Sequence, residues 1–279
     1  MTQSRNGALS AVSRAARTVV RSRPALGALA AIVAGCVAAV VMIPGSAPSP
    51  KPAPYRGVPV RASTARHART AQVVRRDTVP ARPGWTTVAT LSTTVPRYAR
   101  PGGRPDGTVA ANWYGRPSAL PVIGQQPGWV RVRLATRPNG STAWLRTAHL
   151  TFSLTPYRIV VNLTTRHLQM LSDGRVVLTA PAGIGIGGDP TPVGQFFVAF
   201  YEQSLGPGYG PFIMVTSAHS NAIRNWEGSG DAVVGIHGPL GASIGATGAA
   251  VSHGCIRLPI IDLVKLAGLP AGTPITVVA

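Results

Sequence analysis

The hydrophobic pattern of the chain changes along its length. Residues 25–43 form an apolar run of 19 residues without a charged side chain, and about 20 such residues cross a bilayer as a helix. From Trp85 onward, apolar and polar residues alternate in short runs, as at 129–134 and 142–145. Alternation with a period of two is typical of strands with one buried face. The sequence therefore predicts an N-terminal membrane helix followed by a mainly β chain.

The β-rich part divides into two segments. Residues 84–153 carry short strands between turn signals such as Pro138-Asn139-Gly140, which predicts a small barrel. We expect three of its four tryptophans to be core or half-buried residues rather than to line a groove; they are Trp113, Trp129 and Trp144. A second segment, 157–279, opens with strands at 158–163, 168–171 and 176–179, the last two joined by the turn Ser172-Asp173-Gly174.

Composition supports the β assignment. Glycine (32) and proline (26) are abundant in the 279 residues, and charged residues make up only 13%, which disfavours a helix bundle. The glycine-rich stretch 183–188 lacks the Lys-Ser/Thr of a phosphate loop, so no nucleotide site is expected there.

The net charge of +19 is concentrated near the N-terminus. Residues 1–24 form a basic, cytoplasmic tail before the apolar run, and 44–83 form a Pro/Arg-rich linker that is expected to act as an extended tether. No zinc-finger spacing or aromatic RNA-binding motif follows, so nucleic acid is not the expected partner. Anionic lipid or an anionic wall polymer suits this charge better, and a merely solvated tail stays an alternative.

The apolar run also indicates the compartment. We favour a retained membrane anchor at 25–43, with two alternatives left open: cleavage near Gly45-Ser46-Ala47, and lipidation at Cys36. Each of the three places the rest of the chain outside the cytoplasm, either anchored or secreted to the cell wall. Cys255 is then the one cysteine of the exported part, which makes a reactive role plausible.

The neighbourhood of Cys255 contains the groups that thiol catalysis needs. It lies in Ser252-His253-Gly254-Cys255-Ile256-Arg257, and His237 stands upstream in Ile236-His237-Gly238. A nucleophilic thiol needs an imidazole base, a group that orients the imidazole and donors for an oxyanion. If 252–255 is extended, His253, Cys255 and Arg257 share one face, where the guanidinium suits a substrate carboxylate.

The other histidines have no catalytic neighbours in the sequence. We expect His67, His149, His167 and His219 to be ordinary loop or surface residues.

These motifs resemble the active-site signature of the L,D-transpeptidases, the YkuD-type catalytic domain. The stretch 189–196 resembles the Thr-Pro-x-Gly-x-Phe turn of this family, and 272–277 resembles its closing strand. The segment 84–153, with Gly128-Trp129-Val130-Arg131-Val132 and Ala143-Trp144-Leu145, resembles a bacterial SH3-like domain. The implied fold is mainly β: a small SH3-like barrel, then a β-sandwich-like catalytic domain at 157–279, with an N-terminal membrane helix.

The resemblance implies a role for each motif residue. Cys255 would be the nucleophile and His237 its base, oriented by the backbone carbonyl of Gly238. His253, Gly254 and Cys255 would form or support the oxyanion hole, and Ser252 would position the loop. Three residues are expected to contact substrate: Arg257, Gly238 and Tyr209, the last from a lid. Thr191 and Pro192 are expected to be structural.

The resemblance implies a peptidoglycan L,D-transpeptidase that needs no cofactor or metal. It would join third-position diaminopimelate residues of stem peptides through a cysteine thioester, and penem-class β-lactams would acylate the same thiol. Four alternatives stay open: an L,D-carboxypeptidase, a papain-like cysteine hydrolase, a zinc site made of His237, His253 and Cys255, and a non-enzymatic wall-binding protein. In papain-like chains the cysteine precedes the histidine, which is the reverse of the order here.

Overall fold

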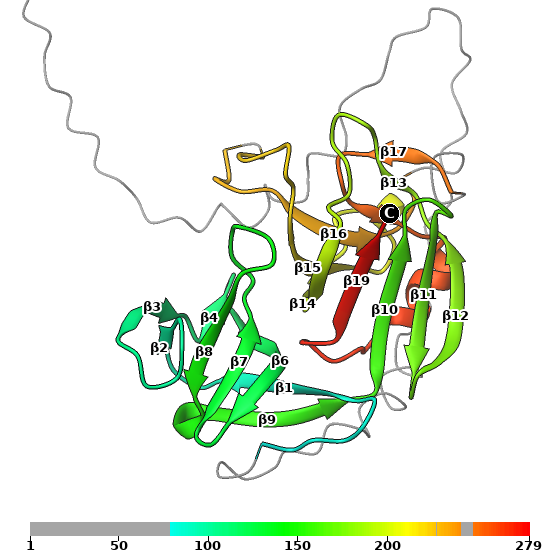
Figure 1. The fold of residues 1–279 in the computed structure, drawn as a ribbon. Helices are drawn as coiled ribbons and strands as arrows, with labels where there is room; N and C mark the ends of the chain where they lie inside the picture. Colours follow the sequence, from blue (N-terminus) through cyan, green and yellow to red (C-terminus); the bar gives the residue numbers. More distant parts are fainter. Residues whose placement is uncertain (1–78, 227, 241–247) are drawn as a thin grey trace, which may run out of the picture.

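The computed structural model describes residues 79–226, 228–240 and 248–279 (Figure 1). The tail at 1–24, the segment at 25–43 and the linker up to residue 78 lie outside the described residues, so what we predict for them stays a prediction. Within the described part of the chain, no helix has the length and apolar character needed to span a bilayer.

The N-terminal domain is built on one curled antiparallel sheet with the strand order β3-β2-β8-β7-β6-β1-β9. Its strands are β1 (Thr86–Leu91), β2 (Val95–Tyr98), β3 (Pro105–Val109), β6 (Ala119–Gln126), β7 (Trp129–Arg133), β8 (Thr142–Arg146) and β9 (Leu150–Thr155), and a separate pair is formed by β4 (Asn112–Trp113) and β5 (Arg116–Pro117). The predicted alternation is present, because neighbouring residues of β8 alternate between partly exposed and buried. Mainly β structure is confirmed, whereas the likeness to an SH3 domain stays a prediction.

The second sheet carries the candidate active site and has the order β12-β11-β10-β19-β14-β15-β16-β18. Its strands are β10 (Tyr157–Asn162), β11 (His167–Ser172), β12 (Arg175–Pro181), β14 (Gly194–Gln203), β15 (Phe212–His219), β16 (Val233–His237), β18 (Ile256–Arg257) and β19 (Pro274–Val278), and β13 (Ile184–Gly185) pairs separately with β17 (Ala250–Ser252). The predicted turn joins β11 to β12, where Asp173 and Gly174 both have positive φ, as tight hairpin turns require.

Short helices close the second domain. They are η4 (Pro207–Tyr209), α3 (Ile260–Leu263) and η5 (Val264–Leu266), whereas η3 (Thr147–His149) joins β8 to β9 in the N-terminal domain. Leu263 of α3 and Leu266 of η5 belong to the same core cluster as Ile159 of β10 and Ile275 of β19, so α3 and η5 cover one face of the eight-stranded sheet (Figure 1). Pro259 immediately precedes α3.

The two domains share part of their hydrophobic core. Phe197 and Ala199 of β14 pack in the same buried cluster as Leu145, Leu150 and Phe152 of the N-terminal domain. Strand β9 also leads into β10 through a single residue, Pro156. The N-terminal domain is therefore docked on the catalytic domain by apolar burial.

Candidate active site

The cysteine lies in a tight turn between β17 and β18. The extended conformation considered for 252–255 is not adopted, because Gly254 has φ +113° and reverses the chain. Ser252 closes this turn: its Oγ accepts a hydrogen bond from Gly254 N–H at 3.1 Å and donates one to the Cys255 carbonyl at 2.6 Å. A left-handed backbone favours glycine, so Gly254 sets the conformation in which the thiol is presented.

Thr191 fixes the same turn from outside. Its hydroxyl donates to the Gly254 carbonyl at 2.9 Å and accepts from Gly185 N–H at 2.9 Å. The side chain is only 3% exposed, so neither bond competes with bulk water. The turn that resembles the family's Thr-Pro-x-Gly-x-Phe motif thus supports the cysteine loop, in line with the structural role expected of Thr191.

Cys255 and His237 are brought together by the pairing of β16 with β18. Ile236 lies opposite Ile256 in this parallel pair, and Gly235 N–H donates to Cys255 Sγ at 3.4 Å. Gly235 and His237 share one face of β16, because side chains alternate along a strand. A Cβ built on Gly235 would lie 3.9 Å from His237 Cδ2, the ring carbon bonded to Nε2. The His237 ring therefore lies over the same face of β16 as Gly235, the residue whose N–H contacts the thiol.

The tautomer of His237 follows from its hydrogen bond. Nδ1 lies 2.8 Å from the carbonyl oxygen of Gly238, and a carbonyl only accepts, so Nδ1 carries the proton. Nε2 is then the acceptor nitrogen; it is buried and makes no hydrogen bond within the described residues. A buried imidazole with an available Nε2 lone pair is suited to accept a proton from a thiol.

Tyr209 and Gly238 hold the histidine in place. The Tyr209 ring lies 4.9 Å from the His237 ring, centroid to centroid, and Gly238 N–H donates to the Tyr209 carbonyl at 2.8 Å. A Cβ at Gly238 would lie 2.6 Å from Ile260 Cδ1 and 2.7 Å from the Gly208 carbonyl oxygen. Tyr209 is buried, so its contact in this structure is with the imidazole rather than with the entrance of a pocket.

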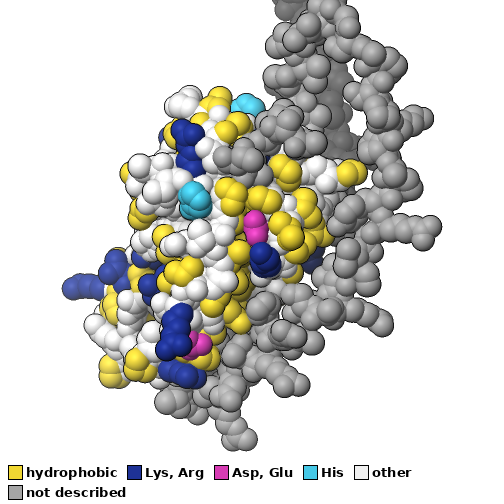
Figure 2. Space-filling view, turned by 90° about the vertical axis from the view of Figure 1, so that its right-hand side faces the viewer, with side chains coloured by type: hydrophobic (Ala, Val, Ile, Leu, Met, Phe, Trp, Pro, Cys, Tyr) yellow, Lys and Arg dark blue, Asp and Glu magenta, His cyan; other side chains and the backbone are white. Residues whose placement is uncertain are grey.

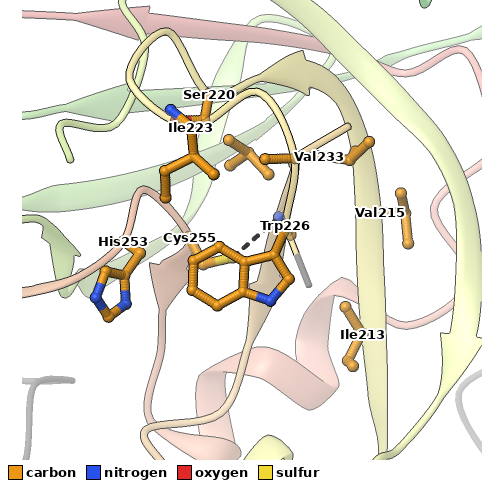
Figure 3. A pocket seen from close by; sticks show the side chains of 11 residues that line it. Ile213, Val215, Ser220, Ile223, Trp226, Val233, His253 and Cys255 are labelled. Carbon is orange, nitrogen blue, oxygen red and sulfur yellow. Dashed lines mark hydrogen bonds between the residues drawn. The ribbon is translucent and has the colours of Figure 1, made fainter. Parts of the chain in front are cut away.

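A pocket opens beside the thiol (Figure 3). Its lining is mainly apolar and comes from β15, β16, the loop between them and the cysteine turn: Ile213, Val215, Ser220, Ile223, Trp226, Ala232, Val233, Val234, Gly235, His253 and Cys255. In Figure 3 the Trp226 indole lies beside Cys255, with Ile223 and His253 close by. The pocket therefore presents one nucleophile within an apolar wall.

His253 lines this pocket, and its side chain is partly exposed to solvent. Its imidazole is 45% exposed, and its Nε2 lies 3.8 Å from Asp189 Oδ2. The ring also lies 5.3 Å from the Trp226 ring. His253 and His237 thus occupy very different surroundings, one at the entrance and one in the core. In the part of the chain that the structure describes, no three His, Cys, Asp or Glu side chains form a metal-binding group.

Arg257 is not on the surface of this pocket. It is 5% exposed, and its backbone pairs with Gly183. Its Nε makes no hydrogen bond, and among the described residues no carboxylate lies within salt-bridge distance of its guanidinium. A buried cation without an anionic partner is costly.

One histidine differs from the prediction. His219 is 2% exposed rather than a surface residue, and its Nδ1 lies 2.8 Å from Asp231 Oδ2. The sequence separates these residues by a loop, and only the hairpin of β15 and β16 brings them together. The hint in the sequence was the apolar run of β15, which ends at this histidine.

The site defines a class: a mainly β domain in which one cysteine lies in a tight turn beside a strand that carries a buried histidine. Residues 156–277 match the family model of YkuD, the L,D-transpeptidase catalytic domain. This segment is therefore an L,D-transpeptidase catalytic domain of the YkuD type, as the sequence predicts, and the assignment of the chain as an enzyme rests on it.

Curated relatives agree with the family match. Two proteins, from Bacillus licheniformis and Bacillus subtilis, whose assignment as the L,D-transpeptidase YkuD is itself provisional, are each 32% identical over 123 and 124 residues. The match covers 44% of this chain and 66% of each relative.

Solved structures of L,D-transpeptidases are also similar. The L,D-transpeptidase from Mycobacterium smegmatis has a TM-score of 0.34 at 21% identity, covering 54% of this chain and 91% of that one. The catalytic domain from the E. faecium enzyme acylated by ertapenem has a TM-score of 0.32 at 26% identity, covering 44% and 97%.

Proposed function

We propose that this protein is a peptidoglycan L,D-transpeptidase that joins third-position diaminopimelate residues of neighbouring stem peptides through a thioester on Cys255. One observation carries the proposal. His237 keeps its Nδ1 proton on the Gly238 carbonyl and leaves a buried, unprotonated Nε2 on β16, the strand whose Gly235 N–H contacts Cys255 Sγ.

The chemistry proceeds in two balanced transfers. His237 Nε2 takes the Sγ proton, and the thiolate attacks the carbonyl of the donor's third residue, so that a C–S bond forms and a tetrahedral oxyanion appears. The C–N bond to the terminal D-alanine then breaks, and the imidazolium returns its proton to the departing amine. The side-chain amine of the acceptor stem gives a proton to His237 and attacks the thioester, which releases the thiolate and closes the cross-link.

The turn around Gly254 supports this chemistry. The resemblance assigns the oxyanion hole to His253, Gly254 and Cys255, but Gly254 N–H is engaged by Ser252 Oγ. Gly254 therefore contributes through the turn that it permits, and Ser252 and Thr191 keep that turn rigid. A preorganised oxyanion site depends on such rigidity, since donors must not reorganise as charge develops.

Arg257 is proposed to hold a substrate carboxylate. Its guanidinium is buried beside the cysteine turn and has no anionic partner among the described residues. A bound carboxylate would therefore offset the free-energy cost of removing this cation from water. Stem peptides carry carboxylates at the donor's C-terminus. Arg257→Gln is expected to raise the KM for a donor stem more than it lowers kcat, measured by steady-state kinetics.

The same thiol is proposed to react with penem-class β-lactams. A β-lactam carbonyl presents the strained amide that a thiolate opens, with the ring nitrogen as a leaving group that stays attached. The apolar walls formed by Ile223 and Trp226 suit the body of such a drug. The related E. faecium domain is described in its ertapenem-acylated form.

The location is proposed to be the cell wall. Residues 25–43 would anchor the chain or direct its export, and the linker would let the catalytic domain reach into the wall. The SH3-like domain is proposed to bind wall peptides or glycans. On the face in Figure 2, dark-blue Lys and Arg side chains outnumber the magenta acidic ones, which suits an anionic polymer.

The test is intact-protein mass spectrometry of the full-length chain with a tetrapeptide stem, wild type beside Cys255→Ala. We expect a transient adduct on the wild type that resolves to a cross-linked dimer, and no adduct on the variant. Resolution to the tripeptide alone would indicate a carboxypeptidase. If the enzyme instead cleaves a peptide at an ordinary L,L bond through a covalent adduct, this would indicate a papain-like hydrolase.

Two controls complete the design. A chelator should leave the activity unchanged, while a thiol alkylating agent should abolish it. The absence of an adduct with any stem would overturn the proposal and favour a non-enzymatic wall-binding protein. A penem adduct that persists on Cys255→Ala would refute the assignment of the nucleophile.

A further inference from the structure

A turn of the N-terminal domain reaches into the catalytic domain. Arg137, between β7 and β8, places its guanidinium on the loop between β15 and β16. Nε donates to Asp231 Oδ1 at 2.9 Å, one Nη donates to the Ser220 carbonyl at 2.8 Å, and the other donates to the Ile223 carbonyl at 3.0 Å. One side chain thus ties both ends of the loop, which we call the 220–231 loop.

Asn139 binds the same hairpin. Its Nδ2 donates to the His219 carbonyl at 2.7 Å, and its Oδ1 accepts from His219 N–H at 2.9 Å. The His219 ring then bridges the domains: Nδ1 lies 2.8 Å from Asp231 Oδ2, and Nε2 lies 3.4 Å from the Ala135 carbonyl. Two polar side chains of one turn, with Pro138 between them, therefore both bond to this hairpin.

Asp231 is the centre of the network. Burial alone would raise its pKa, but hydrogen bonds from His219 and from Ala232 N–H, the charge of His219 and the hydrogen bond from Arg137 outweigh burial, so the pKa is lowered from the ordinary value. The carboxylate is therefore charged at neutral pH. A charge-assisted bond to a planar guanidinium is stronger and more directional than a neutral one.

The inner side of the same loop forms a wall of the thiol pocket. Ser220, Ile223, Trp226 and Ala232 all line it. The loop carries Gly228 and Gly230 with positive φ, and most of its residues are exposed. Few apolar contacts hold such a loop, so its place depends on the polar bonds from the N-terminal domain.

We propose that Arg137 and Asn139 are positioning residues for the Cys255 pocket, so that the N-terminal domain completes the substrate site of the catalytic domain. This inference rests on the proposed function. The thiol and its base are supported separately by β16 and β18, so release of the loop leaves the nucleophile intact and loosens only the wall that contacts the donor.

The test compares Arg137→Ala with Arg116→Ala in the full-length chain. Arg116 also joins the two domains, through an ion pair with Glu202 at 3.6 Å, but it does not contact the loop. The first readout is amide hydrogen exchange over 219–232. We expect faster exchange in Arg137→Ala and wild-type exchange in Arg116→Ala.

The second readout separates binding from chemistry. For penem acylation of Cys255, we expect Arg137→Ala to raise the half-saturation concentration of the penem roughly tenfold or more. The maximal acylation rate should stay within about threefold of wild type. Iodoacetamide reacts with the thiol without contacting the pocket wall, so the rate at which it alkylates Cys255 should change by less than about twofold. Arg137→Lys, which keeps the charge but loses the fork, should recover only part of the affinity.

Each outcome decides the matter. Equal exchange in the two alanine variants, or an equal loss of acylation in both, would overturn the positioning role and leave only domain docking. If Arg137→Ala does not fold, Asn139→Ala is subjected to the same two measurements. If the wild type is acylated by no stem or penem, the proposed function fails, while hydrogen exchange still reports on the loop.

Discussion

The Thr191 hydroxyl is the contact on which the cysteine turn most depends. Thr191→Val keeps the shape of the side chain but removes both of its hydrogen bonds, leaving Gly185 N–H and the Gly254 carbonyl without partners in a buried site. An unsatisfied buried polar group costs about 1–3 kcal/mol. The two together predict a loss of about 2–5 kcal/mol in the free energy of unfolding.

Catalysis should fall as well, because the turn that presents Cys255 loses its outer anchor. A displacement of about 1 Å at a reacting group costs roughly a hundredfold, so we expect penem acylation to slow by about tenfold to a hundredfold. Urea unfolding monitored by tryptophan fluorescence gives the stability. Intact mass measured against time gives the acylation rate.

Thr273→Val is the matched control. Thr273 is also fully buried, and its hydroxyl donates to the Pro270 carbonyl at 2.6 Å and lies 3.4 Å from Thr155 Oγ1, at the boundary with the N-terminal domain. The Thr273→Val variant should lose about 1–3 kcal/mol in its free energy of unfolding, while its acylation rate stays at the wild-type value. Equal acylation rates in Thr191→Val and wild type, measured where both are folded, would refute the role assigned to Thr191.

Three further predictions concern the base and the loop. Gly238→Ala should unfold at lower urea and acylate slowly, because its Cβ would overlap Ile260 and the Gly208 carbonyl; normal kinetics would contradict this. His237→Gln should lower the iodoacetamide alkylation rate of Cys255 and slow acylation by roughly a hundredfold or more, which kinetics with both reagents would measure. The lowered pKa of Asp231 contributes stability that is fully present above about pH 4, the ordinary Asp range, and is lost as pH falls through the folded-state value. Asp231→Asn should therefore flatten the acid side of the stability profile, and parallel urea midpoints from pH 5 to pH 2.5 would disprove it.

The sequence predicted the catalytic pair because its chemistry is local. The motif from Ser252 to Cys255 and the upstream His237 are short and unusual, and the strands around them follow a clear alternation. The cysteine segment departs from an extended conformation for a local reason too. A serine two residues before a glycine can bond its own turn, and that bond outcompetes the strand conformation.

The Arg137 contacts lay beyond sequence reasoning. Arg137 and Asp231 are separated by 94 positions, and no pattern in the sequence distinguishes either of them from an ordinary surface residue. The alternation of single strands does not determine how two sheets dock, since that depends on the shared core around Phe197. Polar residues that meet across domains therefore escape a prediction based on local patterns.

The two histidines of the motif show how burial, rather than residue type, divides their roles. A base must hold one tautomer before substrate arrives, which requires a fixed acceptor for one nitrogen and exclusion of water from the other. His237 meets both conditions through Gly238 and the Tyr209 ring. His253 is 45% exposed, and its weak contact with Asp189 at 3.8 Å leaves its ring free to turn. A solvated imidazole exchanges protons with water, so in the proposed reaction His237, rather than His253, is suited to carry the proton of Cys255 to the leaving amine.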